Sequence, residues 1–284
     1  MSADKPDMET DFKPVVDRRE AISLMEPLLI EPESCFSGII NDLALELAAR
    51  AAGFRRSMPA GITRSLADLV RAMNCYYSNL IEGHDTHPVD IERALQKDYS
   101  SDKEKRNLQL EARAHIEVQA WIDQGDLTGR ALTIDGIREI HRRFAELLPD
   151  ELLWNEDPDS GKRVHIEPGA FRDRDVKVGR HVPVSPGALP RFLGRFERVY
   201  SNLGKSRTIA MAAAAHHRLL WIHPFVDGNG RVTRLMSHAI FIETLDTGGV
   251  WSIARGLAET NKNTRPCWPT VICPEETPWM AEET

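Results

Sequence analysis

One twelve-residue stretch, HPFVDGNGRVTR, gathers several groups that could carry out chemistry. It supplies an imidazole at His223, a carboxylate at Asp227 and two guanidinium groups at Arg231 and Arg234. A histidine titrates near pH 6.5, at about the point where its neutral ring can serve as a general base. Arginines three residues apart share one helix face, and their planar forks match phosphate oxygens. A carboxylate among them would repel a phosphate unless it holds Mg²⁺ against that phosphate.

The backbone of this stretch is also suited to an anion. The residue before a proline avoids the α-helical region, so a helix is expected to end at His223, before Pro224. Gly228, Asn229 and Gly230 then lead directly into another helical pattern. Free N–H groups at a helix start form an anion site, which the helix dipole strengthens. The combination predicts phosphoryl or nucleotidyl transfer from a magnesium-bound nucleotide.

Each part of this motif also has a plain structural alternative. A histidine before a proline is usually structural, a Gly-Asn-Gly segment is usually a turn, and an arginine pair is usually a solvated helix face. The conjunction of the three favours a site. It differs from a P-loop, which ends in Gly-Lys-Ser/Thr.

A second stretch, SNLIEG, ends a helical pattern upstream of the motif. Ser78 and Glu82 are four residues apart and share a helix face, and Gly83 lets the chain turn. On spacing alone, an ordinary helix end explains this stretch best. A glutamate in the last turn is unfavourable, however, because the helix dipole is negative there. A partner for Glu82 is therefore expected.

Helices must position both stretches, because apolar residues recur mostly at helical spacing. Thr63 is expected to cap the helix that ends near Gly83, Pro88 to open the next, and Thr133 to cap a later one. An alternating run at 175–183 predicts a short hairpin or flap. The chain is therefore expected to be all-α with one β excursion. The expected helices cover residues 39–54, 63–83, 88–98, 103–123, 133–148, 188–201, 207–223, 229–245 and 252–260.

Composition narrows the class of protein. The chain has 284 residues, of which 42% are hydrophobic and 28% charged, with a net charge of −7. This charge disfavours general binding to nucleic acid or acidic membranes. The sequence contains no secretory signal and no run of apolar residues long enough for a membrane span. Four scattered cysteines fit neither a disulfide scaffold nor a zinc site, so a cytoplasmic location is expected.

The motif resembles the signature of Fic-domain proteins, His-Pro-Phe-x-Asp/Glu-Gly-Asn-Gly-Arg-x-x-Arg, at all nine specified positions. The likeness extends over roughly residues 65–258. It implies a Fic-type helical core with a short β-hairpin flap over the active site. It also implies AMP transfer from ATP to a Ser, Thr or Tyr hydroxyl of a target protein.

Carried onto this sequence, the resemblance makes His223 the catalytic base and Asp227 the ligand of Mg²⁺. The anion hole would be lined by Gly228, Asn229 and Gly230. Arg231 and Arg234 would bind the phosphate chain of ATP, with Arg234 at its γ end.

SNLIEG is similar to the inhibitory motif of the same family, Ser/Thr-x-x-x-Glu-Gly/Asn. The resemblance implies that Ser78 and Glu82 belong to an inhibitory helix, and that Glu82 pairs with Arg234 in place of the γ-phosphate. The expected organisation is an N-terminal arm and helix at 1–60, an inhibitory-helix region at 61–125, a Fic core at 126–260 and an irregular tail at 261–284. Within the arm, residues 1–35 are expected to be loosely ordered.

Other functions stay open at this point. The same site could remove AMP or transfer another nucleotidyl or phosphoryl group, or the chain could be a catalytically silent nucleotide-binding regulator. A homodimer is an open alternative to a single chain. A protein carrying an accessible hydroxyl is the expected partner, with neither nucleic acid nor membrane.

Overall fold

A computed structural model of the chain describes residues 15–84, 86–156, 161 and 163–264. Within that part of the chain the structure is mainly helical, with one small two-stranded antiparallel sheet, which confirms the expected fold class. The helices are α1 (Ser37–Ser57), α2 (Ala60–Ile81), α3 (Pro88–Leu95), α4 (Lys103–Asp123), α5 (Ile134–Glu146), α6 (Leu189–Tyr200), α7 (Lys205–Ile222), α8 (Asn229–Leu245) and α9 (Ile253–Thr264).

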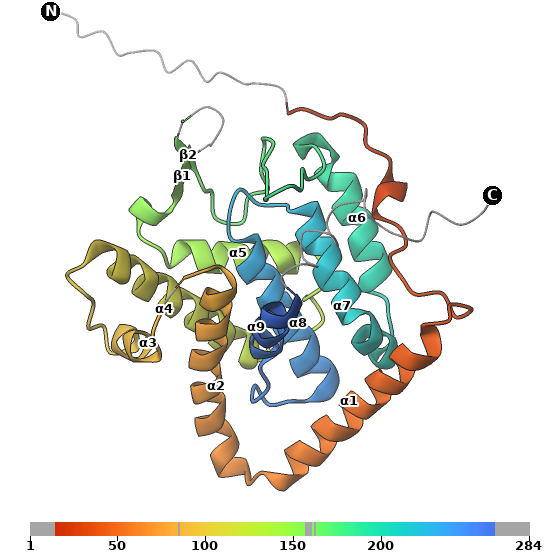
Figure 1. The fold of residues 1–284 in the computed structure, drawn as a ribbon, viewed down its shortest axis with the longest axis horizontal. Coiled ribbons are helices and arrows are strands. Elements are labelled where there is room, and N and C mark those ends of the chain that lie inside the picture. The colour runs from red at the N-terminus through yellow and green to blue at the C-terminus, as the bar shows by residue number, and fades with distance from the viewer. Residues whose placement is uncertain (1–14, 85, 157–160, 162, 265–284) are drawn as a thin grey trace, which may run out of the picture.

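Helix α8 is the centre of the fold (Figure 1). Every residue from 231 to 240 is buried, so this helix has no solvated face. Helices α4, α5, α7 and α9 all contact it, and α6 packs on α7. The main hydrophobic core fills the space between α4, α5, α6, α7 and α8. The start of α8 is therefore held on a rigid element, as a precise site requires.

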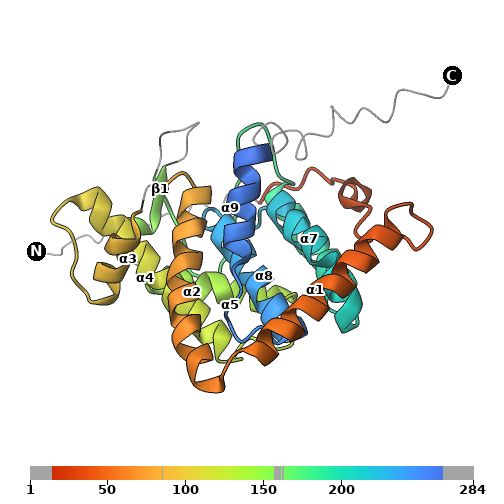
Figure 2. The ribbon, with the colours of Figure 1, turned by 60° about the horizontal axis from the view of Figure 1, so that its bottom comes forward.

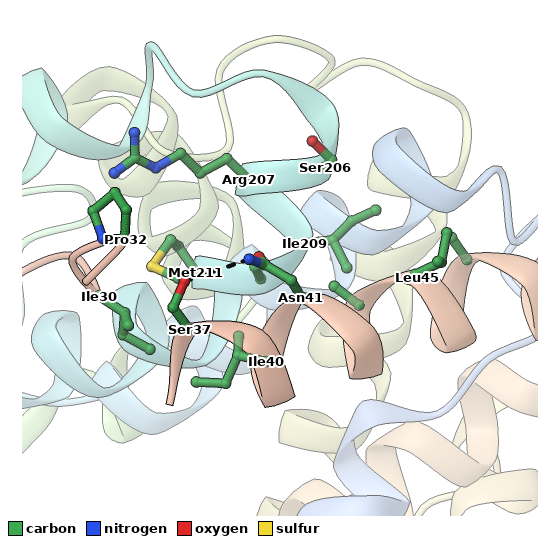
Figure 3. Close-up of a pocket in the computed structure, with 13 residues that line it drawn as sticks. Ile30, Pro32, Ser37, Ile40, Asn41, Leu45, Ser206, Arg207, Ile209 and Met211 are labelled. Carbon is green, nitrogen blue, oxygen red and sulfur yellow. Dashed lines mark hydrogen bonds between the residues drawn. The ribbon is translucent and has the colours of Figure 1, made fainter. Parts of the chain in front are cut away.

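Helix α2 covers one side of this core. It contacts α4 and α9, while α1 leaves it at a sharp angle and crosses to α7, so that α1 and α2 form a V (Figure 2). Between α1 and the start of α7 lies a groove of about 480 Å³, lined mostly by apolar side chains (Figure 3). None of the helices in the described part of the chain is both long and apolar enough to cross a bilayer.

Local signals fix most of the helix ends. Thr133 caps α5 by accepting a hydrogen bond from the Gly136 amide at 3.0 Å, and Pro88 opens α3. Gly83 turns the chain after α2 with a φ of 85°. The expected start of α2 at Thr63 is wrong, because Pro59 ends α1 and lets α2 begin at Ala60.

The expected loose arm is wrong for the residues that follow position 14. We name residues 16–30 the strap. They pack on α6 and on the residues that lead into α6. Met25 is fully buried, and the Tyr200 hydroxyl donates to the Leu28 carbonyl at 2.6 Å. The strap has no regular secondary structure apart from a short 3₁₀ turn at Ile22–Met25, so its buried residues follow no helical or strand period. At the other end α9 continues to Thr264, and the rest of the expected tail lies outside the described residues.

The regular hairpin lies upstream of its expected position. It pairs β1 (Trp154–Glu156) with β2 (Arg163–His165) in antiparallel register. We name residues 174–183, which include the alternating run, the flap. The flap contains a single antiparallel bridge, between Val178 and His181. Gly179 takes a φ of 61° in the two-residue turn inside that bridge, as tight hairpin turns require, and the bridge is not extended into a regular ladder.

Candidate active site

The imidazole of His223 lies at the C-terminal end of α7. The helix ends at Ile222, and His223 takes left-handed dihedral angles, φ 51° and ψ 64°. Such angles cost a non-glycine residue about 1–2 kcal/mol, but Pro224 disfavours the helical alternative. Burial of the ring lowers the pKa of His223 to about 4. The imidazole is therefore neutral near pH 7 and able to accept a proton.

Arg172 holds the backbone of His223 in this conformation. Its buried guanidinium donates from Nε to the His223 carbonyl at 2.7 Å. Its terminal nitrogens donate to the carbonyls of Arg174 at 2.9 Å and Val184 at 2.5 Å. Burial lowers the pKa of Arg172 to about 10, so the group stays charged near neutrality. One buried side chain thus joins the end of α7 to both ends of the flap.

The loop between α7 and α8 is closed by its own side chains. Phe225 is fully buried and anchors the loop. The side-chain amide of Asn229 accepts from the Phe225 amide and donates to the Phe225 carbonyl, both at 2.9 Å. Gly228, with a φ of 77°, precedes α8. Because α8 starts at Asn229, the N–H groups of its first turn lack intrahelical acceptors, as an anion site requires.

His141 on α5 supports this loop, and the sequence analysis missed it. Its ring stacks on Phe225 with the centroids 4.0 Å apart and the planes within 2° of parallel. Its Nδ1 accepts from the Gly169 amide at 2.9 Å. Burial lowers the pKa of His141 to about 4, which keeps Nδ1 free to accept. The available signal was a histidine on the apolar face of α5, between Ile140 and Phe144.

The carboxylate of Glu82 lies against the start of α8. A Cβ built on Gly230 would overlap Glu82 Oε1 and would lie 3.1 Å from Arg234 Nη1. Only a residue without a side chain leaves room for an anion at this point of the helix. Glu82 therefore lies beside the first turn of α8, whose N–H groups are suited to an anion.

Ser78 and Glu82 both bind Arg234, which is 7% exposed. Arg234 Nη2 donates to Glu82 Oε1 at 2.5 Å, and its Nε donates to the Ser78 hydroxyl at 2.8 Å. Burial alone would raise the pKa of Glu82, but the charge of Arg234 outweighs that effect and the pKa lies below its usual value. The expected contact between the two motifs is present, and the last turn of α2 makes it.

The other arginine of the motif has a different partner. Arg231 forms an ion pair with Glu111 of α4, and both side chains are mostly buried. Its guanidinium carbon also lies 5.3 Å from the centre of the Phe144 ring. Arg231 is thus held by α4 and α5, whereas Arg234 is held by α2.

Asp227 is the exposed acid of the site. Its Oδ1 accepts from the Gly228 amide at 2.6 Å. Among the residues that the structure describes, no three His, Cys, Asp or Glu side chains gather as a metal site. One exposed carboxylate beside a phosphate site nevertheless fits Mg²⁺, which commonly takes one or two carboxylates and completes its shell with substrate phosphates and water.

A pocket of about 250 Å³ opens above His223. The flap forms one wall of the pocket, and the hairpin of β1 and β2 contributes another. Its lining includes Asn155, Val164, Asp175, Val178, His223 and Val226. A chain lying in this pocket would contact both the imidazole and the backbone of the flap.

Comparison with known proteins identifies the domain that holds this site. Residues 131–241 match the family model described as Fic/DOC family. The chain carries a Fic/DOC domain. This domain includes α5, the flap, α6, α7 and nearly all of α8, and it ends before α9.

Relatives of this Fic domain are named protein adenylyltransferase Fic. Those from Drosophila sechellia and Drosophila melanogaster are 32% identical over 177 residues, covering 53% of this chain and 33% of the relative. The chain thus spans about a third of the length of these relatives.

Solved structures of Fic proteins share the fold. A Fic-domain signalling protein from Bacteroides thetaiotaomicron superposes with a TM-score of 0.56 at 20% identity, over 78% of this chain and 79% of the other. A Fic family protein from Desulfovibrio desulfuricans G20 gives a TM-score of 0.61 at 14% identity, over 82% of this chain and 66% of the other.

Proposed function

We propose that this chain is a protein adenylyltransferase, and that Glu82 restrains it. It would transfer AMP from ATP to a Ser, Thr or Tyr hydroxyl of a target protein. The observation that carries the proposal is the position of Glu82 against Gly230, with Arg234 shared between Glu82 and Ser78. The names of the relatives support the same chemistry.

In the proposed reaction, ATP binds with its phosphates at the start of α8. Gly228, Asn229 and Gly230 provide backbone N–H groups, and Arg234, once released from Glu82, binds the γ-phosphate. Arg231 lies one helical turn earlier and would bind phosphate oxygens once it leaves Glu111. The Asp227 carboxylate would hold Mg²⁺, which neutralises part of the phosphate charge when it is bound.

His223 would act as the general base. The neutral imidazole takes the proton of the target hydroxyl, and the hydroxyl oxygen forms a bond to the α-phosphorus. The bond from the α-phosphorus to the bridging oxygen breaks, and pyrophosphate leaves with that oxygen. The product is a phosphodiester between AMP and the target side chain.

Restraint by Glu82 follows from competition between two anions. The carboxylate and the phosphate chain of ATP share the start of α8 and Arg234. A bound nucleotide must displace the carboxylate or bind out of line for attack. If displacing Glu82 raises the activation free energy of AMP transfer by about 1.4–2.7 kcal/mol, transfer is slowed about tenfold to a hundredfold.

The test is AMP incorporation with [α-³²P]ATP and Mg²⁺, measured as self-modification and on proteins of a lysate. Glu82→Gly should increase incorporation about tenfold to a hundredfold, since it removes that contribution to the activation free energy. Glu46→Gln, a change on the exposed part of α1, is the matched control and should leave incorporation unchanged. Adding His223→Ala to Glu82→Gly should abolish incorporation.

The result also separates the other functions. No incorporation in Glu82→Gly, together with measurable ATP binding, would favour a nucleotide-binding regulator. If the protein removes AMP from an already modified protein and incorporates none, AMP removal would be favoured as its function. Equal incorporation with and without Glu82 would contradict the restraint.

A further inference from the structure

We propose that the strap fixes the flap in place through Arg18, and that Arg18 is a positioning residue for the protein substrate. The role in transfer rests on the adenylyltransferase function proposed above. The mechanical part, that Arg18 limits motion of the flap, is independent of that function.

Arg18 contacts both limbs of the flap. Its Nη1 donates to Asp175 Oδ2 at 2.7 Å, on the limb that enters the turn. Its Nη2 lies 3.4 Å from the Pro183 carbonyl, on the limb that leaves it. The bridge between Val178 and His181 lies between these two points. The guanidinium of Arg18 therefore connects the two limbs of the flap at the end away from the turn.

The base of this connection is buried. The Arg18 amide donates to the Ser185 hydroxyl at 3.0 Å, and that hydroxyl is fully buried. Glu20 accepts from the Ser185 amide and from its hydroxyl, both at 2.7 Å. Asp17 pairs with Arg191 of α6 at 2.6 and 2.8 Å. The backbone of the strap is thus fixed on both sides of Arg18.

The flap has few other attachments among the described residues. From the buried side, Arg172 donates to the carbonyls of Arg174 and Val184, at the two ends of the flap. His181 Nε2 lies 2.8 Å from the Trp221 carbonyl of α7. The side chains of Val178 and Val182 are largely exposed. Arg18 therefore joins the outer side of the flap to the strap.

A surface ion pair is usually weak, and this one is 42% exposed at Arg18 and 48% at Asp175. Two features distinguish it from such a pair. It bridges two limbs of one turn, and the backbone at Arg18 is fixed by buried hydrogen bonds, so the position from which the side chain starts is set by the fold. Even a modest contribution to flap position affects a reaction that depends on placing the hydroxyl close to His223.

The first test measures the flap without nucleotide. Hydrogen exchange of the Val178 and His181 amides, which donate across the bridge, reports its opening. Arg18→Ala should speed this exchange about threefold to tenfold, and Arg18→Glu more, since it repels Asp175. Arg18→Lys should restore much of the protection. Arg195→Ala is the matched control, because it breaks the exposed strap pair with Glu26 at 2.8 Å, away from the flap.

The second test adds the same changes to Glu82→Gly and measures AMP transfer from [α-³²P]ATP to lysate proteins. AMP transfer should be reduced least by Arg18→Lys, more by Arg18→Ala and most by Arg18→Glu. Affinity for ATP should be unchanged, because Arg18 does not contact the start of α8. A merely destabilising change would lower the melting temperature and ATP binding together.

Unchanged exchange in Arg18→Glu would overturn the proposal. Faster exchange with unchanged transfer would overturn the positioning role. Should Glu82→Gly itself transfer no AMP, the adenylyltransferase function fails, while the exchange rates still decide whether Arg18 holds the flap.

Discussion

At the scale of single residues, the site keeps a neutral base beside a region built for negative charge. Burial, which lowers the pKa of His223 to about 4, makes the larger contribution. The hydrogen bond between Nδ1 and the Leu220 carbonyl, at 3.4 Å, opposes it. A base with so low a pKa holds a proton weakly, but it is fully in the accepting form at neutral pH.

The pH dependence of AMP transfer follows from this pKa. In Glu82→Gly at saturating Mg²⁺-ATP, the rate should stay level from pH 8 down to about 5, because the neutral imidazole is the active form. It should fall as the pH approaches about 4 and the ring takes up a proton. Circular dichroism at each pH checks that the protein is folded. A midpoint near 6.5 would show that the ring is solvated in the working enzyme.

Gly230 permits a second prediction at this scale. A Cβ at this position would overlap Glu82 Oε1 and approach Arg234 Nη1. Gly230→Ala should therefore weaken the contact of Glu82 and also crowd a phosphate in the same space. Calorimetry should show a loss of ATP affinity of about tenfold or more, since a displaced phosphate loses charge-assisted hydrogen bonds. Gly194→Ala, at a position in α6 with open space around it, is the control.

At the scale of elements, α2 is the part that places Glu82 against the start of α8. Its contact with α4 combines an apolar cluster around Cys75 with one polar pair: Asn74 Nδ2 donates to Gln119 at 3.3 Å, and Asn74 Oδ1 and Gln119 Nε2 are buried without a partner. Unpaired buried groups cost about 1–3 kcal/mol each. These unpaired groups weaken the contact between α2 and α4, as the restraint proposed above would require of an element that has to release Arg234.

Ser78 tests how α2 is held. Ser78→Ala leaves Arg234 Nε buried without its acceptor, at a cost of about 1–3 kcal/mol. The melting temperature should fall by about 2–4 °C per kcal/mol for a chain of this size. Ser65→Ala, at an exposed position of the same helix, should leave it unchanged. An equal effect of both changes would mean that helix propensity, not the contact with Arg234, sets the result.

The sequence predicted those features of the elements that depend on neighbouring residues. Pro224, Gly83 and Thr133 end or cap helices where expected because their effects are local. The strap and the role of Arg172 could not be predicted in this way. Arg172 acts through carbonyl groups about 50 residues away, and no periodicity records such a contact. His141 was missed for the same reason.

At the scale of the whole molecule, buried neutral histidines link stability to pH. Burial lowers the pKa of His115 to about 3, and those of His141, His216 and His223 to about 4. In the unfolded chain each ring takes up a proton near pH 6.5, about 2.5 to 3.5 units higher. Between these values the unfolded state binds more protons, so stability falls as the pH falls.

The free energy of unfolding should accordingly decrease from pH 6.5 toward pH 4, by up to about 1.4 kcal/mol per pH unit for each ring, and the melting temperature should fall with it. Loss of the Glu82–Arg234 pair adds to this only at the acid end, because the pKa of Glu82 is lowered. Scanning calorimetry across this range measures the effect. A constant melting temperature between pH 7 and 5 would contradict the buried neutral state of these rings.

The network of Arg172 has a mechanical consequence. The guanidinium of Arg172 binds the backbone carbonyl of His223 and carbonyl groups at both ends of the flap. A polypeptide that displaced the flap would therefore also shift the backbone that carries the imidazole. Under the proposed function, binding of the target and orientation of the base would be coupled through this one side chain.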